Sequence, residues 1–146
     1  MLEKLFKTGS DDYAGLIARL TLGIVILPHG LQKLLGLFGG HGFAATVDFF
    51  STSGIPTPVA ILIILGESIG AIFLIIGFIS RISALGIGLI MTGAILMVHA
   101  ANGFFMNWFG NQQGEGFEYH LLVIGLSLIV IINGGGKWSV DKSISK

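Results

Sequence analysis

The sequence contains no cysteine among its 146 residues. A chain without thiols forms no disulfide, no thiolate metal site and no redox-active dithiol. Charge is also scarce: only 11% of the residues are charged, and eight basic side chains balance eight acidic ones. A neutral chain lacks the basic surface that nucleic acid requires, so we expect no nucleic-acid partner. The histidines show no HExxH spacing, and the sequence predicts no metal site.

Apolar residues, by contrast, are abundant: they make up 53% of the chain, and the mean hydropathy is +0.88. A bilayer core is crossed by about 20 apolar residues. Four apolar segments approach that length, at residues 13–37, 57–79, 82–101 and 117–133. Short turns favour antiparallel packing of successive helices. The predicted fold class is therefore all-α, an integral membrane antiparallel four-helix bundle in lipid, formed by one domain over residues 1–146.

The segments outside the spans differ in character. The N-terminal stretch MLEKLFKTGSDD is polar and has no apolar signal-peptide core, so we expect the first span to be retained. Ser10, Asp11 and Asp12 offer side chains that can cap that span. Residues 41–58 predict a long loop that packs on the membrane surface or re-enters the bundle, with prolines that keep the chain extended before the next helix.

Four spans place both termini on one side of the membrane. Basic residues in cytoplasmic segments set membrane orientation. All but one of the basic residues fall on the side of the termini: Lys4, Lys7, Arg81, Lys137, Lys142 and Lys146, with Arg19 inside the first span. The other side holds Lys33 at a span end. We therefore predict a multi-pass protein of the cell membrane with both termini in the cytoplasm.

Polar side chains inside the spans are costly, so they indicate function by default. Counting about 1.5 Å per residue along alternating spans places most of them in one layer of the outer leaflet. The members of this layer are His29, Lys33, His99, Asn102, Glu118 and His120. Glu67 is predicted near the midplane and Arg19 deeper, and these two form the predicted buried ion pair. His29, beside Pro28, offers Glu67 an alternative partner through a ring nitrogen.

These residues suggest a site with divided roles. We predict Glu67 and His29 as catalytic residues, and the following as ligand-binding residues: Arg19, Lys33, His99, Asn102, Glu118 and His120. Histidines in such a bundle can transfer protons, hold haem or a metal, or serve as satisfied polar groups near the interface. The Arg19–Glu67 pair could equally be structural and fix the helix register. Neighbouring phenylalanines could form the walls of an apolar pocket for a flat ring.

Several stretches resemble the DoxX family of small membrane proteins, over nearly the whole chain from Ala18 to Asp141. They are ARLTLG (18–23), HGLQKLLGLFGG (29–40), GIPTP (54–58), GES (66–68), VHAANGFF (98–105) and WSVD (138–141). The HG–QK–FGG run followed by GIP–P is the most specific. Pro28 before the histidine and the Asn-Gln-Gln stretch at 111–113 look individual to this chain. The resemblance implies a four-span inner-membrane protein, related to proteins that serve as subunits of a thiosulfate:quinone oxidoreductase or as membrane anchors of an oxidoreductase complex.

Three functions are compatible with these features. The leading hypothesis is a membrane subunit of a redox system that binds quinone, with haem as the less favoured cofactor. Without cysteine or a dinucleotide motif, its electrons must come from a partner, such as a soluble oxidoreductase subunit, or from a bound cofactor. The second is a non-catalytic scaffold whose buried charges only fix helix packing. The third is a small transporter, in which a homo-oligomer encloses the path.

Overall fold

A computed structural model describes residues 6–9 and 12–145, and these residues form helices without any strand. The α-helices are α2 (Tyr13–Leu35), α3 (Gly42–Thr52), α4 (Thr57–Leu65), α5 (Ala71–Ile76), α6 (Ser80–Ala94), α7 (Glu118–Asn133) and α8 (Val140–Ile144). Two π-helical segments, Gly66–Gly70 and Ile95–His99, extend α4 and α6 without a break in the chain direction. Short 3₁₀ turns lie at Leu37–Gly39 and Ala100–Asn102.

Three continuous helical stretches are long and apolar enough to cross a membrane: Tyr13–Leu35, Thr57–Ile76 and Ser80–Asn102. The apolar helix α7, Glu118–Asn133, is shorter. The predicted all-α membrane fold is therefore confirmed, with span ends that differ from the predicted ones by at most three residues. The second span ends early because Gly77 adopts φ 73°, a left-handed conformation that terminates α5.

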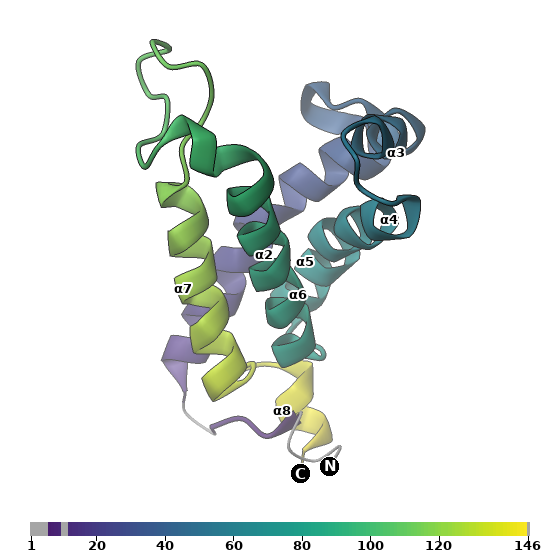
Figure 1. Ribbon diagram of the computed structural model, residues 1–146. Helices are drawn as coiled ribbons and strands as arrows, with labels where there is room; N and C mark the ends of the chain where they lie inside the picture. Colours follow the sequence, from purple (N-terminus) through teal and green to yellow (C-terminus); the bar gives the residue numbers. More distant parts are fainter. Residues whose placement is uncertain (1–5, 10–11, 146) are drawn as a thin grey trace.

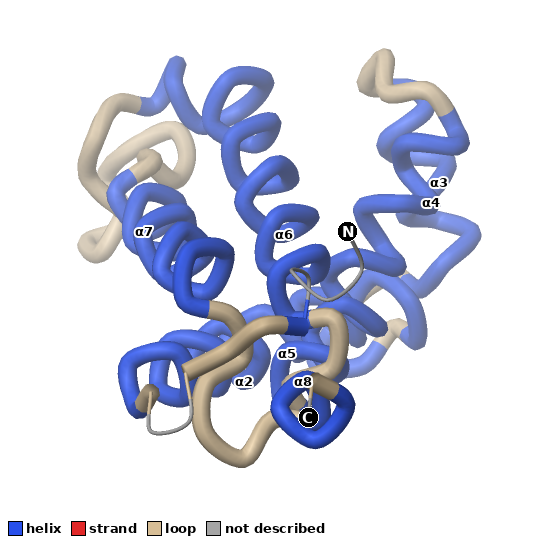
Figure 2. The backbone as a smooth tube through the Cα atoms, turned by 90° about the horizontal axis from the view of Figure 1, so that it is seen from below, coloured by secondary structure: helices blue, strands red, loops and turns tan. Residues whose placement is uncertain are grey.

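The helices splay apart at one end of the molecule. At the lower end in Figure 1, α2, α5, α6 and α7 converge, and α2 packs against both α5 and α7. At the upper end, α3 and α4 lean away from α6 and α7, and the view from below shows the same separation (Figure 2). The core of the converging part is formed by small and branched side chains such as Ala18, Leu22, Leu74, Ile87 and Val130.

The region 41–58, predicted as a loop, contains an eleven-residue helix, α3. The loop prediction was wrong for Gly42–Thr52. This helix packs against α2 and α4 and buries Thr46, so tertiary packing stabilises a segment whose own pattern is weak. The extended conformation expected at the prolines is confirmed at Pro56, with φ −57° and ψ 138°.

The start of α2 is capped as the sequence predicts. Asp12 is the N-cap residue, and its carboxylate accepts a hydrogen bond from the Gly15 amide at 3.0 Å. The corresponding predictions for Ser10 and Asp11, and those for Met1 to Leu5, lie outside the described residues.

Arg19 is part of a clamp at the lower end of the bundle, and the predicted Arg19–Glu67 ion pair was wrong. The side chain is 2% exposed and donates five hydrogen bonds, all to backbone carbonyls. The acceptors are Leu74 and Ile75 at the end of α5, and Gly135, Lys137 and Trp138 in the segment after α7. Carbonyls at helix ends lack intrahelical partners, so a guanidinium can satisfy several of them at once.

Asp141 completes this clamp from the C-terminal side. Its carboxylate, 1% exposed, accepts hydrogen bonds from the amides of Ile79 at 2.7 Å and Ser80 at 2.9 Å. These amides open α6, where a negative charge is favourable. The segment between α7 and α8 is thereby held across the lower end of the bundle, as the view from below shows (Figure 2).

Candidate functional site

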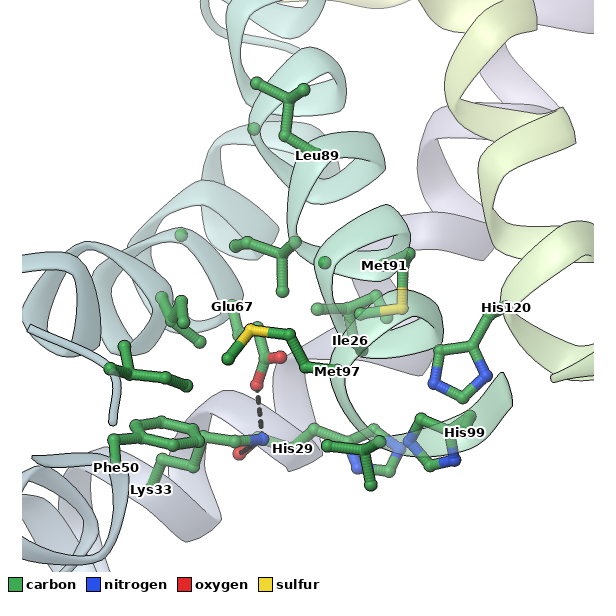
Figure 3. Close-up of a pocket in the computed structure, with 18 of the residues that line it drawn as sticks. Ile26, His29, Lys33, Phe50, Glu67, Leu89, Met91, Met97, His99 and His120 are labelled. Atoms are coloured by element: carbon green, nitrogen blue, oxygen red, sulfur yellow. Dashed lines mark hydrogen bonds and ion pairs between the residues drawn. The ribbon is translucent and has the colours of Figure 1, made fainter. Parts of the chain in front are cut away.

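A cavity of about 920 Å³ lies where the helices splay apart. Its volume is within the range of small-molecule binding sites. The walls are largely apolar, and residues such as Ile26, Phe50, Leu62, Ile90 and Met97 line it. Its polar lining consists of His29, Lys33, Glu67, His99, Glu115, Tyr119 and His120. Figure 3 shows many of these side chains converging from α2, the α4–α5 span, α6 and α7.

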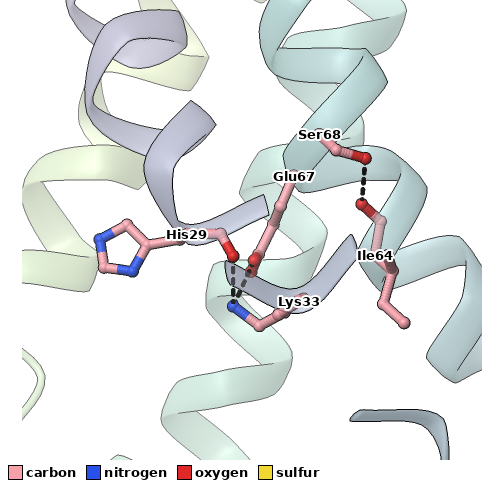
Figure 4. A network of polar contacts seen from close by, with 5 residues as sticks. All are labelled: His29, Lys33, Ile64, Glu67 and Ser68. Carbon is pink, nitrogen blue, oxygen red and sulfur yellow. Dashed lines mark hydrogen bonds and ion pairs between the residues drawn. The ribbon is translucent and has the colours of Figure 1, made fainter. Parts of the chain in front are cut away.

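Lys33 and Glu67 form an ion pair at this cavity. Lys33 Nζ lies 2.5 Å from Glu67 Oε2, and the Glu67 side chain is 6% exposed against 25% for Lys33. The ammonium also lies 3.5 Å from the backbone carbonyl of His29, one turn earlier on α2. The His29 ring points away from Glu67, so the alternative prediction of a ring hydrogen bond to Glu67 was wrong (Figure 4). Only the backbone of His29 joins this network.

Gly30 explains why Glu67 pairs with Lys33 and not with Arg19. A Cβ atom at Gly30 would collide with the backbone of Glu67, so α2 and the π-helical segment touch at this point. Lys33 follows Gly30 by three residues and faces the same neighbour. Arg19 precedes Gly30 by eleven residues, roughly 16 Å along the helix axis, and lies out of reach.

Glu67 and His99 both belong to π-helical segments, which the sequence did not reveal. Such segments insert an extra residue into a helical turn and are frequent at functional sites. In the first of them, the Ser68 hydroxyl donates to the Ile64 carbonyl at 2.6 Å, which satisfies a carbonyl within the widened helix. The only local sequence feature of the first π-helical segment is the pair of glycines at its two ends, Gly66 and Gly70.

A wall of aromatic side chains forms the α7 side of the cavity. The His99 and His120 rings lie 4.1 Å apart between centroids, Tyr119 lies 5.6 Å from His120, and His29 lies 6.4 Å from Tyr119. His99 and His120 are seen side by side in Figure 3. His99 Nδ1 lies 2.8 Å from the Glu115 carbonyl, and because a carbonyl can only accept, this nitrogen donates. That bond fixes the orientation of the His99 ring.

The structure therefore brings five of the eight predicted site residues to one cavity: His29, Lys33, Glu67, His99 and His120. Arg19, Asn102 and Glu118 do not line it. Asn102 donates to the Glu115 carbonyl at 3.1 Å, and Glu118 accepts from the Met106 amide at 2.9 Å and the Trp108 indole at 3.2 Å. These two side chains hold the loop between α6 and α7 in place.

Sequence reasoning overlooked Tyr119 and Glu115, which both line the cavity. Tyr119 directly precedes His120 at the start of the last span, so the prediction of His120 as a site residue could have drawn attention to Tyr119. Glu115 contributes its backbone carbonyl to the site from within the loop, which no side-chain pattern could indicate. Among the described residues, no group of three or more His, Asp or Glu side chains is arranged to hold a metal ion.

Two bacterial proteins are similar to this chain over most of its length. It is 31% identical over 127 residues to a Bacillus subtilis (strain 168) protein named "Putative oxidoreductase CatD", covering 87% of this chain and 81% of that protein. It is 27% identical over 136 residues to the "Inner membrane protein YqjF" of Escherichia coli (strain K12), covering 93% and 95%. No solved structure matches the chain. The DoxX family model matches residues 14–100, from the first turn of α2 to the residue after His99, and the chain belongs to the DoxX family.

Proposed function

We propose that this protein is an inner-membrane subunit of a quinone-linked redox system, with both termini in the cytoplasm, and that the cavity binds the quinone. One observation carries the proposal: a single cavity of about 920 Å³ combines apolar walls with a half-buried Lys33–Glu67 pair and three histidines. A flat, lipid-soluble ring with polar oxygens complements such a site. The related Bacillus subtilis protein carries the word oxidoreductase in its name.

Access to the cavity supports a lipid-soluble ligand. Several residues that line it lie on the outer surface of the helices, including Leu62 at 66% exposure and Leu89 at 65%. In a bilayer, such apolar side chains face hydrocarbon. A ligand dissolved in the membrane therefore reaches the cavity sideways between α4 and α6, without crossing an aqueous phase.

The residues of the cavity suit proton-coupled chemistry. Reduction of a quinone to a quinol takes up two electrons and two protons. The protein has neither thiols nor a dinucleotide motif, so the electrons come from a soluble oxidoreductase partner. Glu67 and His29 transfer the protons: the Glu67 carboxylate first takes up a proton from water and then gives it to the quinone oxygen, and the His29 imidazole does the same. Lys33 holds Glu67 in place and supplies positive charge beside a ring oxygen as negative charge develops.

The test is quinone binding by site variants with matched controls. Radiolabelled menadione, a lipid-soluble naphthoquinone, is bound to the full chain in phosphatidylcholine nanodiscs and corrected for empty nanodiscs. Glu67→Gln and His29→Ala should abolish saturable binding while the helical circular dichroism remains. The controls are Asp48→Asn and His41→Ala, exposed residues that do not line the cavity. Normal binding by both site variants contradicts the assignment.

The same variants distinguish the alternative functions. A non-catalytic scaffold predicts that Glu67→Gln lowers thermal stability and partner recruitment while the chain binds no menadione at all. A transporter predicts movement of a polar solute across liposomes that contain the protein, above the rate for liposomes without it. A redox subunit predicts binding without flux.

A further inference from the structure

Two residues in the first turn of α7 line the cavity and each carries a buried polar atom without a hydrogen-bond partner. The hydroxyl oxygen of Tyr119 and Nδ1 of His120 are buried and have no hydrogen-bond partner among the described residues. Both residues line the cavity. Six buried side-chain atoms in the described part of the chain lack a partner, and the other four belong to Asp12, Ser80, Arg81 and Ser127, which lie away from the cavity. Among the described residues that line the cavity, the buried polar atoms without a hydrogen-bond partner therefore all belong to the first turn of α7.

Packing holds both side chains in position. The Tyr119 ring packs against the hydrophobic core that α7 shares with α2 and α6. His120 is 7% exposed and is held between two rings, Tyr119 at 5.6 Å edge-on and His99 at 4.1 Å. The hydrogen bond from His99 to the Glu115 carbonyl fixes the orientation of the His99 ring.

A buried polar atom without a partner destabilises a protein by about 1–3 kcal/mol, so it requires a water molecule or a ligand. A phenol hydroxyl and an imidazole nitrogen can each donate or accept a hydrogen bond. Together they suit an oxygen that is a carbonyl in one state of the ligand and a hydroxyl in another. The Lys33–Glu67 pair, by contrast, satisfies itself.

We propose that Tyr119 and His120 form a second polar anchor in the cavity, which recognises a ring oxygen of the ligand and so selects oxygenated aromatic rings over hydrocarbon rings of the same shape. This inference rests on the proposed function and adds a specificity determinant to it. Tyr119 and His120 bind one oxygen on the α7 side, and Lys33 lies at the second polar position of the cavity. His99 is a positioning residue, since it acts through the His120 ring.

The experiment compares two ligands of nearly equal shape. Menadione carries two carbonyl oxygens attached to its ring, and 2-methylnaphthalene carries none. Both are radiolabelled and bound to the full chain in phosphatidylcholine nanodiscs. Tyr119→Phe removes only the hydroxyl and should weaken menadione binding about fivefold, the equivalent of one neutral hydrogen bond, without changing the affinity for 2-methylnaphthalene.

Control variants separate recognition from folding. Tyr13→Phe is the matched control, because the only other tyrosine accepts a hydrogen bond from Lys137 at 2.6 Å at the far end of the bundle. His120→Asn keeps a polar atom near the position of Nδ1 and should retain most of the menadione affinity, whereas His120→Leu should lose it. Retained binding of 2-methylnaphthalene shows that each variant still folds its cavity.

Three results would overturn the inference. If Tyr119→Phe binds menadione as the wild type does, water satisfies these atoms and they do not recognise the ligand. If Tyr119→Phe weakens both compounds equally, the side chain serves packing alone. A wild-type chain that binds neither compound refutes the proposed function and this inference with it, whereas normal menadione binding by Tyr119→Phe refutes this inference alone.

Discussion

Replacing Arg19 with lysine should strongly destabilise the bundle although it conserves the charge. The guanidinium donates five hydrogen bonds to carbonyls from two segments that are far apart in the sequence. A lysine ammonium has three donors, so at least two of the five carbonyls lose their partner. A hydrogen bond to a charged group contributes about 1.5–3 kcal/mol, which gives a loss of about 3–6 kcal/mol. Water can reach carbonyls near the end of the bundle, so we expect the lower value, about 3 kcal/mol.

The measurement is unfolding of the purified protein in mixed micelles with increasing dodecyl sulfate, followed by circular dichroism. The control is Arg81→Lys, since Arg81 is only half-buried and donates to three carbonyls, those of Ile131, Ile132 and Lys7. A lysine can match that number, and we expect a loss below about 1 kcal/mol. Equal losses of unfolding free energy for the two variants, within about 0.5 kcal/mol, would refute the reasoning that the Arg19 guanidinium group holds the C-terminal segment.

Two further predictions follow from single contacts, and a third follows from the predicted orientation of the termini. Gly30→Ala should lower the free energy of unfolding by about 2 kcal/mol in the same assay, because the new Cβ atom meets the Glu67 backbone. The control Gly125→Ala should be neutral, since a Cβ atom at Gly125 meets open space. Equal effects of the two substitutions would contradict the close approach of α2 to the segment that carries Glu67. Asp141→Asn weakens the cap of α6 and should lower stability by about 1 kcal/mol, with faster tryptic cleavage of the C-terminal segment; an unchanged cleavage rate would count against the clamp. A C-terminal green fluorescent protein fusion should fluoresce and a C-terminal alkaline phosphatase fusion should be inactive, and the reverse pattern would place the termini outside.

Arg19 and Asp141 at the lower end and Tyr119 and His120 at the cavity have different roles, and hydrogen-bond satisfaction distinguishes these two pairs of residues. At the lower end, the nitrogen atoms of Arg19 and both oxygens of Asp141 find backbone partners within the protein. At the splayed end, Tyr119 and His120 have polar atoms without a partner beside a cavity. Satisfied groups of the first kind fix the structure, whereas unsatisfied groups of the second kind indicate ligand binding.

The sequence by itself determined the fold class and the approximate spans. A run of apolar residues must be helical in lipid because every backbone amide and carbonyl needs an internal partner there. Span direction alternates, and this alone brought His29, Lys33, His99 and His120 to one level. The N-cap at Asp12 could also be predicted, because it depends on residues that are neighbours in the chain.

Only the tertiary structure decided which charges pair and what each polar group contacts. The contact of Gly30 with the Glu67 backbone sets the register that selects Lys33 as the partner of Glu67. The partners of Arg19 are backbone carbonyls, which every residue has, so no side-chain pattern could reveal them. The sequence fixes depth along each helix to within a turn, but it does not fix helix rotation or crossing, and these decide which side chains meet.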